Sequence, residues 1–167
     1  MSRTAWEIEN AFNACFRVSH CTVLRGGADE PVYAPSRDPI RAPHVIRYRE
    51  DYVQSALHEV AHWCLAGRSR RLRPDYGYWY APDGRTPAQQ AAFERVEVKP
   101  QALEWVFAEA AGVTFSLSAD NLEGNSTPSH QFASAVSAQR ARYLCDGLPQ
   151  RAKVFMARLR PPGSPGR

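Results

Sequence analysis

The sequence predicts a single α+β domain that is mostly helical and carries a few short strands. Its 167 residues match the usual size of one domain. Apolar residues recur at helical spacing in several long stretches, whereas the β-type runs are short and lie mainly in residues 20–50. Strand and helix patterns do not alternate along the sequence, so we do not expect a parallel sheet. We expect residues 1–159 to form the domain and the Pro/Gly/Arg-rich residues 160–167 to be a flexible tail.

Composition excludes several classes of protein. Apolar residues make up 44% of the sequence and charged residues 23%, which excludes a disordered protein. The net charge of +4 is concentrated in residues 140–167, which suits an acidic partner without making the whole protein a nucleic-acid binder. No apolar run is long enough for a membrane helix, and Glu7 and Glu9 occupy the place of a signal peptide's apolar run. We expect a cytoplasmic protein, monomeric, with four reduced cysteines.

The first half of the sequence contains two predicted helices. Residues 5–18 form one apolar stripe through Ile8, Phe12 and Phe16. Residues 20–50 combine prolines and glycines with short β-type runs, which predicts loops and short strands. The clearest helical pattern covers residues 52–66, where Asp51 and Gln54 fit a capping box and a glycine follows at residue 67.

The second half begins with a basic turn, residues 68–73, and an aromatic run, residues 76–80, which predicts a strand. Thr86, a proline at the first helical position and Gln89 then start a helix that should end at Gly112. Pro100 lies inside this helix and is expected to kink it near Val96. Residues 113–118 are expected to form a short strand, residues 120–129 a loop, and residues 130–146 and 149–159 the terminal helices.

The best-supported helix carries the motif H-E-x-x-H at His58, Glu59 and His62. Four residues advance a helix by about 400°, so the two imidazoles project within roughly 40° of each other, one turn apart. They can therefore bind one metal ion. The alternative interpretation is a pair of surface histidines with an unrelated glutamate between them.

A site with two histidines needs a third protein ligand if it is to keep an open position for chemistry. The helix of residues 87–112 offers a row of polar side chains at helical spacing: Glu94, Glu97, Gln101 and Glu104. If the two helices pack antiparallel, a carboxylate of this row can reach the ion. We choose Glu97, which lies in the middle of the helix, with Glu94 as the second choice. A solvated charged face explains either glutamate taken alone.

Other residues that commonly bind metals are not expected in this site. His20, His44 and His130 stand alone in or beside predicted loops. Cys64 lies about 200° round its helix from His62, so the two cannot share an ion.

Two histidines and one carboxylate leave both the metal and the reaction open. This set serves zinc peptidases, in which the middle glutamate activates water, and non-haem iron oxygenases, in which open positions bind dioxygen. Spacing alone favours the peptidase, with Glu59 as the general base, because H-E-x-x-H on a helix is the peptidase signature.

Four motifs occur in order along the sequence: SALHE and AHWCLAG around the two histidines (residues 55–59 and 61–67), DYGYWYAPDGR (75–85), VEVKPQAL (96–103) and DNLEG (120–124). Shorter likenesses lie at residues 12–16 and 29–33. Together these motifs closely resemble the bacterial elongation factor P hydroxylase family. The resemblance covers nearly the whole sequence except the C-terminal tail.

The resemblance implies hydroxylation of the β-lysylated lysine of translation elongation factor P, which would be the protein partner. It implies a metal held by His58, His62 and Glu97, and a fold similar to small zinc-peptidase-like domains. The metal would be Fe(II) in function, although zinc, nickel or cobalt could occupy the site in purified protein. Glu59 would bind the substrate amine or a water molecule. Further pocket candidates follow from the family motifs: Asp75, Tyr78, Asp83, Asp120 and Asn121.

Two rival functions remain open at this point. One is the zinc peptidase; the other is a binding module with a structural metal, although three ligands instead of four argue against a closed structural site.

Two surfaces could take part in substrate binding. The arginines of residues 68–73, with the basic C-terminal region, could steer an acidic protein to the site. The aromatic residues of positions 76–80 could wall a slot for a long aliphatic side chain or could simply fill the core.

Overall fold

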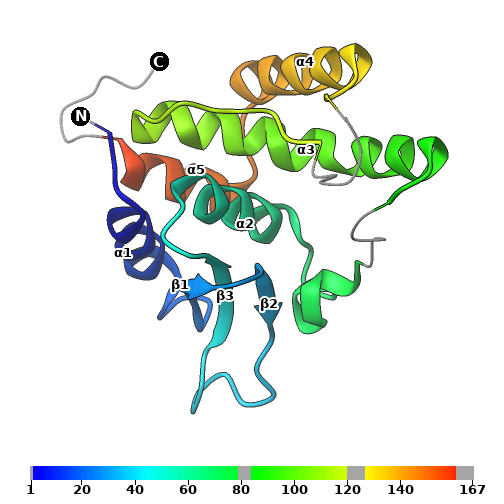
Figure 1. Ribbon diagram of the computed structural model, residues 1–167. Helices are drawn as coiled ribbons and strands as arrows, with labels where there is room; N and C mark the ends of the chain where they lie inside the picture. The colour runs from blue at the N-terminus through cyan, green and yellow to red at the C-terminus, as the bar shows by residue number, and fades with distance from the viewer. Residues whose placement is uncertain (1, 79–83, 120–126, 161–167) are drawn as a thin grey trace.

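The computed structural model describes residues 2–78, 84–119 and 127–160 (Figure 1). These residues form five α-helices and one small three-stranded sheet, which confirms a mostly helical α+β fold. The sheet lies at one side, and α1 and α2 pack on it. Helix α5 lies against α1, α2 and α3, helix α3 packs against α2, and α4 packs on the other side of α3 (Figure 1). The element bounds are α1 (Ala5–Phe16), β1 (Thr22–Ala28), β2 (Val32–Ala34), β3 (His44–Arg49), α2 (Val53–Leu65), α3 (Pro87–Ala111), α4 (His130–Asp146) and α5 (Gln150–Leu159).

The sheet corrects one prediction, because its order is β1-β3-β2 and β1 pairs with β3 in parallel. Strand β2 runs antiparallel to β3 and carries the backbone back across the sheet. A return strand therefore replaces the crossover helix of a βαβ unit, and the lack of strand and helix alternation did not exclude a parallel pair. Leu24, Tyr33 and Ile46 lie side by side in register and are all buried in the core.

Helix α1 begins with a capping box between Thr4 and Glu7 and ends at Phe16, two residues before the predicted end. Its Phe12 and Phe16 rings contact Trp63 of α2, with ring centroids 5.1 and 4.8 Å apart. Trp63 is fully buried. The aromatic contact fixes α2 against α1, and α2 carries the H-E-x-x-H motif.

Helix α2 forms over the predicted residues, but the predicted capping box at Asp51 is wrong. The N-cap is Tyr52, whose side chain makes no capping hydrogen bond, and Asp51 is exposed. The Ser55 hydroxyl instead accepts a hydrogen bond from the Arg49 N–H at 2.9 Å, so the first turn of the helix is tied back to β3. This hydrogen bond holds the end of β3 against the first turn of α2.

The C-terminus of α2 is closed by arginine side chains from two distant parts of the sequence. The Ala66 carbonyl accepts hydrogen bonds from Arg71 Nη1 at 2.8 Å and from Arg151 Nη2 at 2.6 Å. Both guanidinium groups also lie over the Trp63 ring. These positive groups satisfy a carbonyl that the helix leaves unpaired and complement its dipole.

The segment after α2 corrects the predicted strand at residues 76–80. Residues Arg70–Leu72 and Pro74–Gly77 form two short 3-10 turns, and Asp75 and Tyr76 have φ values of 46° and 60°. Such left-handed backbone cannot continue a strand. Trp79 and Tyr80 of the same prediction lie outside the described residues.

Helix α3 is confirmed, with a capping box between Thr86 and Gln89 and Gly112 in the left-handed conformation at its end. It continues across Pro100 as one helix. The predicted strand at residues 113–118 is wrong. The Gln101 side chain binds both the N–H and the carbonyl of Ser118, at 3.0 and 2.8 Å, so a helix side chain takes the bonds that a neighbouring strand would make.

Helices α4 and α5 form where the sequence predicts them, and Arg160 is the C-cap of α5. Residues 161–167 of the predicted tail lie outside the described residues. In the part of the protein that the structure describes, no helix has both the length and the apolar character needed to cross a membrane.

Candidate metal centre

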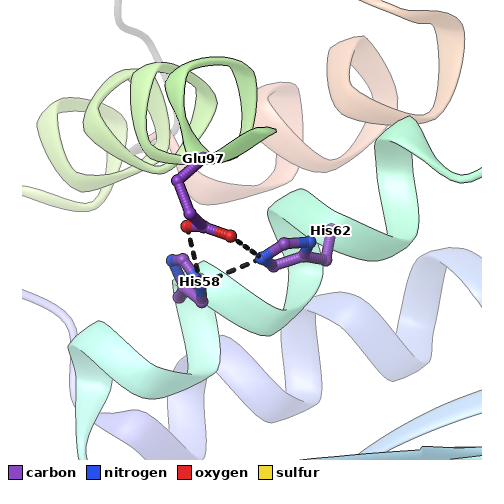
Figure 2. Close-up of side chains that lie close together, drawn as sticks. All are labelled: His58, His62 and Glu97. Carbon is purple, nitrogen blue, oxygen red and sulfur yellow. Dashed lines mark hydrogen bonds and ion pairs between the residues drawn. The ribbon is translucent and has the colours of Figure 1, made fainter. Parts of the chain in front are cut away.

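His58 and His62 of α2 and Glu97 of α3 converge where the two helices pack (Figure 2). The two Nε2 atoms are 3.0 Å apart. Glu97 Oε1 lies 3.1 Å from Nε2 of His62, and Oε2 lies 3.5 Å from Nε2 of His58. The predicted set of residues is therefore brought together, with one potential ligand atom from each residue within 4.8 Å of the others.

The separations of these atoms fit a shared metal ion. Two ligand atoms that each lie about 2.1 Å from one ion, at angles of about 90° to 110°, are about 3.0–3.4 Å apart. The Glu97 side chain is only 3% exposed, while those of His58 and His62 are 27% and 16% exposed. The donor set of two imidazoles and one carboxylate suits zinc or iron, and the histidine side of the site faces solvent.

Two further side chains of α3 orient the potential ligands. Glu104 Oε2 lies 2.8 Å from Nδ1 of His58 and is buried. This contact engages Nδ1 and leaves Nε2 directed at the site. Gln101 donates a hydrogen bond from Nε2 to Glu97 Oε2 at 3.3 Å. A carboxylate behind a metal-binding histidine fixes the ring and raises its basicity.

The charges of the site are strongly coupled. Burial would lower the pKa of His58, but the Glu97 carboxylate and the hydrogen bond to Glu104 outweigh burial and raise this pKa to about 10. Burial would raise the pKa of Glu97, but His62 and His58 outweigh it and lower this pKa to about 2. Without a metal ion, protonated His58 therefore offsets part of the negative charge of the buried carboxylates. A divalent cation could replace this positive charge.

The polar residues of the row on α3 have two different roles: three lie at the histidines, and Glu94 contacts the start of α4. Sequence spacing identified Glu97, but it did not separate Glu104 and Gln101, which support the ligands, from the rest of the row. The second choice for the ligand, Glu94, binds the Ser129 hydroxyl at 2.8 Å and so holds the start of α4. The one signal available was the seven-residue spacing from Glu97 to Glu104, which keeps both on one helix face.

The other potential ligands lie outside this group, as expected. His44 accepts a hydrogen bond from the Ser36 N–H, and the His20 ring packs edge-on against Trp63. The group of metal-binding residues found among the described residues contains neither of them, nor Cys64.

Glu59 lies between the two histidines on α2 and is half-buried. Burial raises the pKa of its carboxyl, the two histidines oppose this, and the negative charges of Glu97 and Asp75 add to it. No hydrogen bond to the Glu59 side chain occurs among the described residues. The carboxylate is thus available for a positive or hydrogen-bonding group.

The remaining pocket candidates have varied surroundings. Asp75 Oδ1 accepts a hydrogen bond from the Tyr33 N–H at 2.8 Å. Tyr78 is exposed and lies under the Arg70 guanidinium, 4.2 Å from its ring centroid. Three further candidates lie outside the described residues: Asp83, Asp120 and Asn121.

The fold and the site define a small α+β protein with a candidate metal site of two histidines and one glutamate between two packed helices. Residues 11–161 match the family model described as Elongation factor P hydroxylase, so the protein belongs to this family. It is also 47% identical, over 148 residues, to the elongation factor P lysine hydroxylase of Haemophilus influenzae (strain ATCC 51907 / DSM 11121 / KW20 / Rd). That match covers 89% of this protein and 83% of the relative. The resemblance found in the sequence is therefore confirmed.

Proposed function

We propose that this protein hydroxylates the β-lysylated lysine side chain of translation elongation factor P. Membership of the hydroxylase family identifies the reaction and its protein substrate. The observation that carries the chemistry is the convergence of His58, His62 and Glu97. Three protein ligands leave at least one coordination position of a metal ion open. We propose these three residues as the metal ligands.

The net reaction converts a C–H bond of the lysine side chain into C–OH with one oxygen atom of dioxygen. The other oxygen atom leaves as water, with two electrons and two protons from a reductant. A bound divalent metal, Fe(II) in function, supplies the activation of dioxygen. Zinc, nickel or cobalt can replace iron in purified protein, because affinity follows the general divalent series.

The residues of the protein have separate tasks in this proposal. Glu104 holds the His58 ring, and Gln101 holds the Glu97 carboxylate. Glu59 binds the cationic amine of the substrate side chain, because an ammonium group offsets both its burial and the negative charges of Glu97 and Asp75. Binding of this amine orients the substrate side chain beside the metal ligands.

The direct test is a mass measurement on the factor. Iron-loaded protein, a reductant and dioxygen should raise the mass of β-lysylated elongation factor P by one oxygen atom, and His58→Ala should abolish the gain. The factor isolated from cells that lack this protein should show the same loss. An unchanged mass with the wild-type enzyme would contradict the proposal.

The peptidase alternative predicts a different result from the same site. A zinc-loaded peptidase would cleave generic peptides with Glu59 as general base, and Glu59→Gln would abolish cleavage. Peptide cleavage without any mass gain in the factor would favour this alternative.

We also propose that the protein acts as a monomer in the cytoplasm, where its substrate serves translation.

A further inference from the structure

The Tyr76 hydroxyl is a buried polar group without a hydrogen-bond partner in the described part of the protein. The residue is 4% exposed. Its ring stacks on Tyr33 at 4.4 Å between centroids and lies parallel to the His62 ring at 6.4 Å. Buried hydroxyls nearly always find a partner, so one that is unpaired beside a catalytic site needs an explanation.

The backbone that holds Tyr76 is strained. Asp75 and Tyr76 both adopt positive φ, at 46° and 60°, and Gly77 follows at 73°. Three contacts stabilise this turn: the Asp75 carboxylate accepts the Tyr33 N–H, Arg70 Nη1 donates to the Tyr76 carbonyl at 3.2 Å, and the two tyrosine rings stack. Backbone strain of this kind persists where surrounding contacts enforce it and is found most often at functional sites.

The Glu59 carboxylate is a suitable acceptor near the hydroxyl. Glu59 stands three residues before His62 on α2, so the two side chains are neighbours on the helix surface, and the Tyr76 ring lies beside the His62 ring. Burial raises the pKa of the Tyr76 phenol, and the negative charge of Glu59 raises it further, ahead of Tyr33, Cys64 and Asp75. The Tyr33 hydroxyl already donates a hydrogen bond to the Arg71 carbonyl at 2.7 Å. Asp75 Oδ1 already accepts a hydrogen bond from the backbone N–H of Tyr33. The Glu59 carboxylate, by contrast, accepts no hydrogen bond from the described residues and is half-buried.

We propose that Tyr76 is a positioning residue, whose hydroxyl donates a hydrogen bond to the Glu59 carboxylate in the loaded site. The bond satisfies both unpaired groups and directs Glu59 toward the substrate amine. This inference rests on the proposed function for the role of Glu59. The strained turn is the part of the fold that brings the Tyr76 hydroxyl to the H-E-x-x-H helix.

The test is a double-mutant cycle with Tyr76→Phe and Glu59→Gln. Tyr76→Phe keeps the ring that stacks on Tyr33 and removes only the hydroxyl. We expect it to lower kcat/KM for hydroxylation by about tenfold to hundredfold, the effect of one hydrogen bond to a charged group. Because Tyr76 acts through Glu59, the double variant should be no worse than Glu59→Gln alone. Metal content should be unchanged, and the thermal midpoint should not fall.

Two control variants separate positioning from structure. Tyr143→Phe removes another buried hydroxyl without a partner, on α4, and should leave kcat/KM unchanged. Tyr33→Phe removes the hydroxyl that is already bonded to the Arg71 carbonyl and should lower stability without coupling to Glu59. Wild-type kcat/KM in Tyr76→Phe, or losses that multiply in the double variant, would overturn the proposal.

A crystal structure of the metal-loaded protein tests the inference independently of turnover. The Tyr76 Oη atom should lie about 2.7 Å from a Glu59 carboxylate oxygen. A distance above about 3.5 Å would overturn the bond even if hydroxylation is confirmed. If the wild-type enzyme does not hydroxylate the factor, the proposed function fails, and this distance still decides whether Tyr76 binds Glu59.

Discussion

The packed faces of α2 and α3 and the turn at residues 70–78 both adjoin His62 but are stabilised in different ways. The helix faces bring charged groups together by regular spacing: His58 and His62 lie one turn apart, and Glu97 and Glu104 lie two turns apart. The turn has no regular spacing and depends on long-range bonds such as Asp75 to Tyr33. The helices thus supply the charged groups, and the strained turn places the Tyr76 ring beside one of them, His62.

The largest expected effect comes from removing a ligand on the helix faces. Glu97→Ala should lower metal content from about one equivalent to near zero, because the carboxylate is one of the three ligands that we propose. Elemental analysis of the purified variants measures this directly. The matched control is Glu94→Ala, one turn away on the same helix, which should keep its metal because Glu94 binds Ser129. Equal metal content in both variants would refute the assignment of Glu97.

The second prediction concerns the pH dependence of the metal-free protein. The pKa of His58 is about 10 in the folded state against an ordinary value of 6.5. The group therefore contributes stability fully below about pH 6.5, and this contribution is lost as pH rises toward about 10. Urea unfolding of chelator-treated protein should show a loss on the order of a few kcal/mol over this range.

His58→Gln should flatten this dependence, whereas His130→Gln, at an exposed histidine, should leave it unchanged. A metal-free protein that becomes more stable from pH 6.5 to 9 would contradict the charge arrangement described for the site.

A smaller effect is expected at the carboxylate behind the ligand. Glu104→Gln keeps the shape of the side chain and weakens its interaction with Nδ1 of His58, so metal affinity should fall by about 10–100-fold. Competition with a chromophoric chelator gives the dissociation constant. Glu109→Gln, an exposed position on the same helix, serves as the control. Unchanged affinity in Glu104→Gln would show that this contact does not support the ligand.

Substitutions in the turn region should lower the stability of the fold without changing metal binding. Arg71→Ala removes the bond to the Ala66 carbonyl and the contact with Trp63, and should cost about 1–2 kcal/mol of unfolding free energy. Arg68 is exposed, and Arg68→Ala should change stability by less than about 0.5 kcal/mol. Thermal unfolding of the two variants makes the comparison. Equal midpoints would mean that Arg71 does not close α2.

The smallest expected effect is on binding of the factor. Because Arg70 and Arg71 are engaged within the fold, a test of the basic surface should use the exposed Arg68 and Arg73. Their replacement by glutamate should slow association by a few fold and reduce its salt dependence. Arg37→Glu, on the loop between β2 and β3, is the charge-matched control for each single replacement. Equal association rates in all variants would rule out this surface.

Local patterns in the sequence predicted the five helices and the two histidines of the candidate metal centre. The capping box at Thr86 and the i, i+4 histidines act within one helix, so neighbouring residues suffice to predict them. The choice of Glu97 depended on its position in the middle of the helix and on antiparallel packing of the two helices. The contacts run in antiparallel order, because His58 lies beside Glu104 and His62, one turn later, lies beside Glu97.

Only the tertiary structure decided which groups pair between distant segments. It separated Glu97 and Glu104, which lie at the histidines, from Glu94, which binds Ser129. It also paired β1 with β3 in parallel and placed Tyr76 and Gly77, the start of the strand predicted at residues 76–80, in a left-handed turn. These outcomes depend on contacts between residues far apart in sequence, whose energies outweigh the small local preferences for helix, strand or turn.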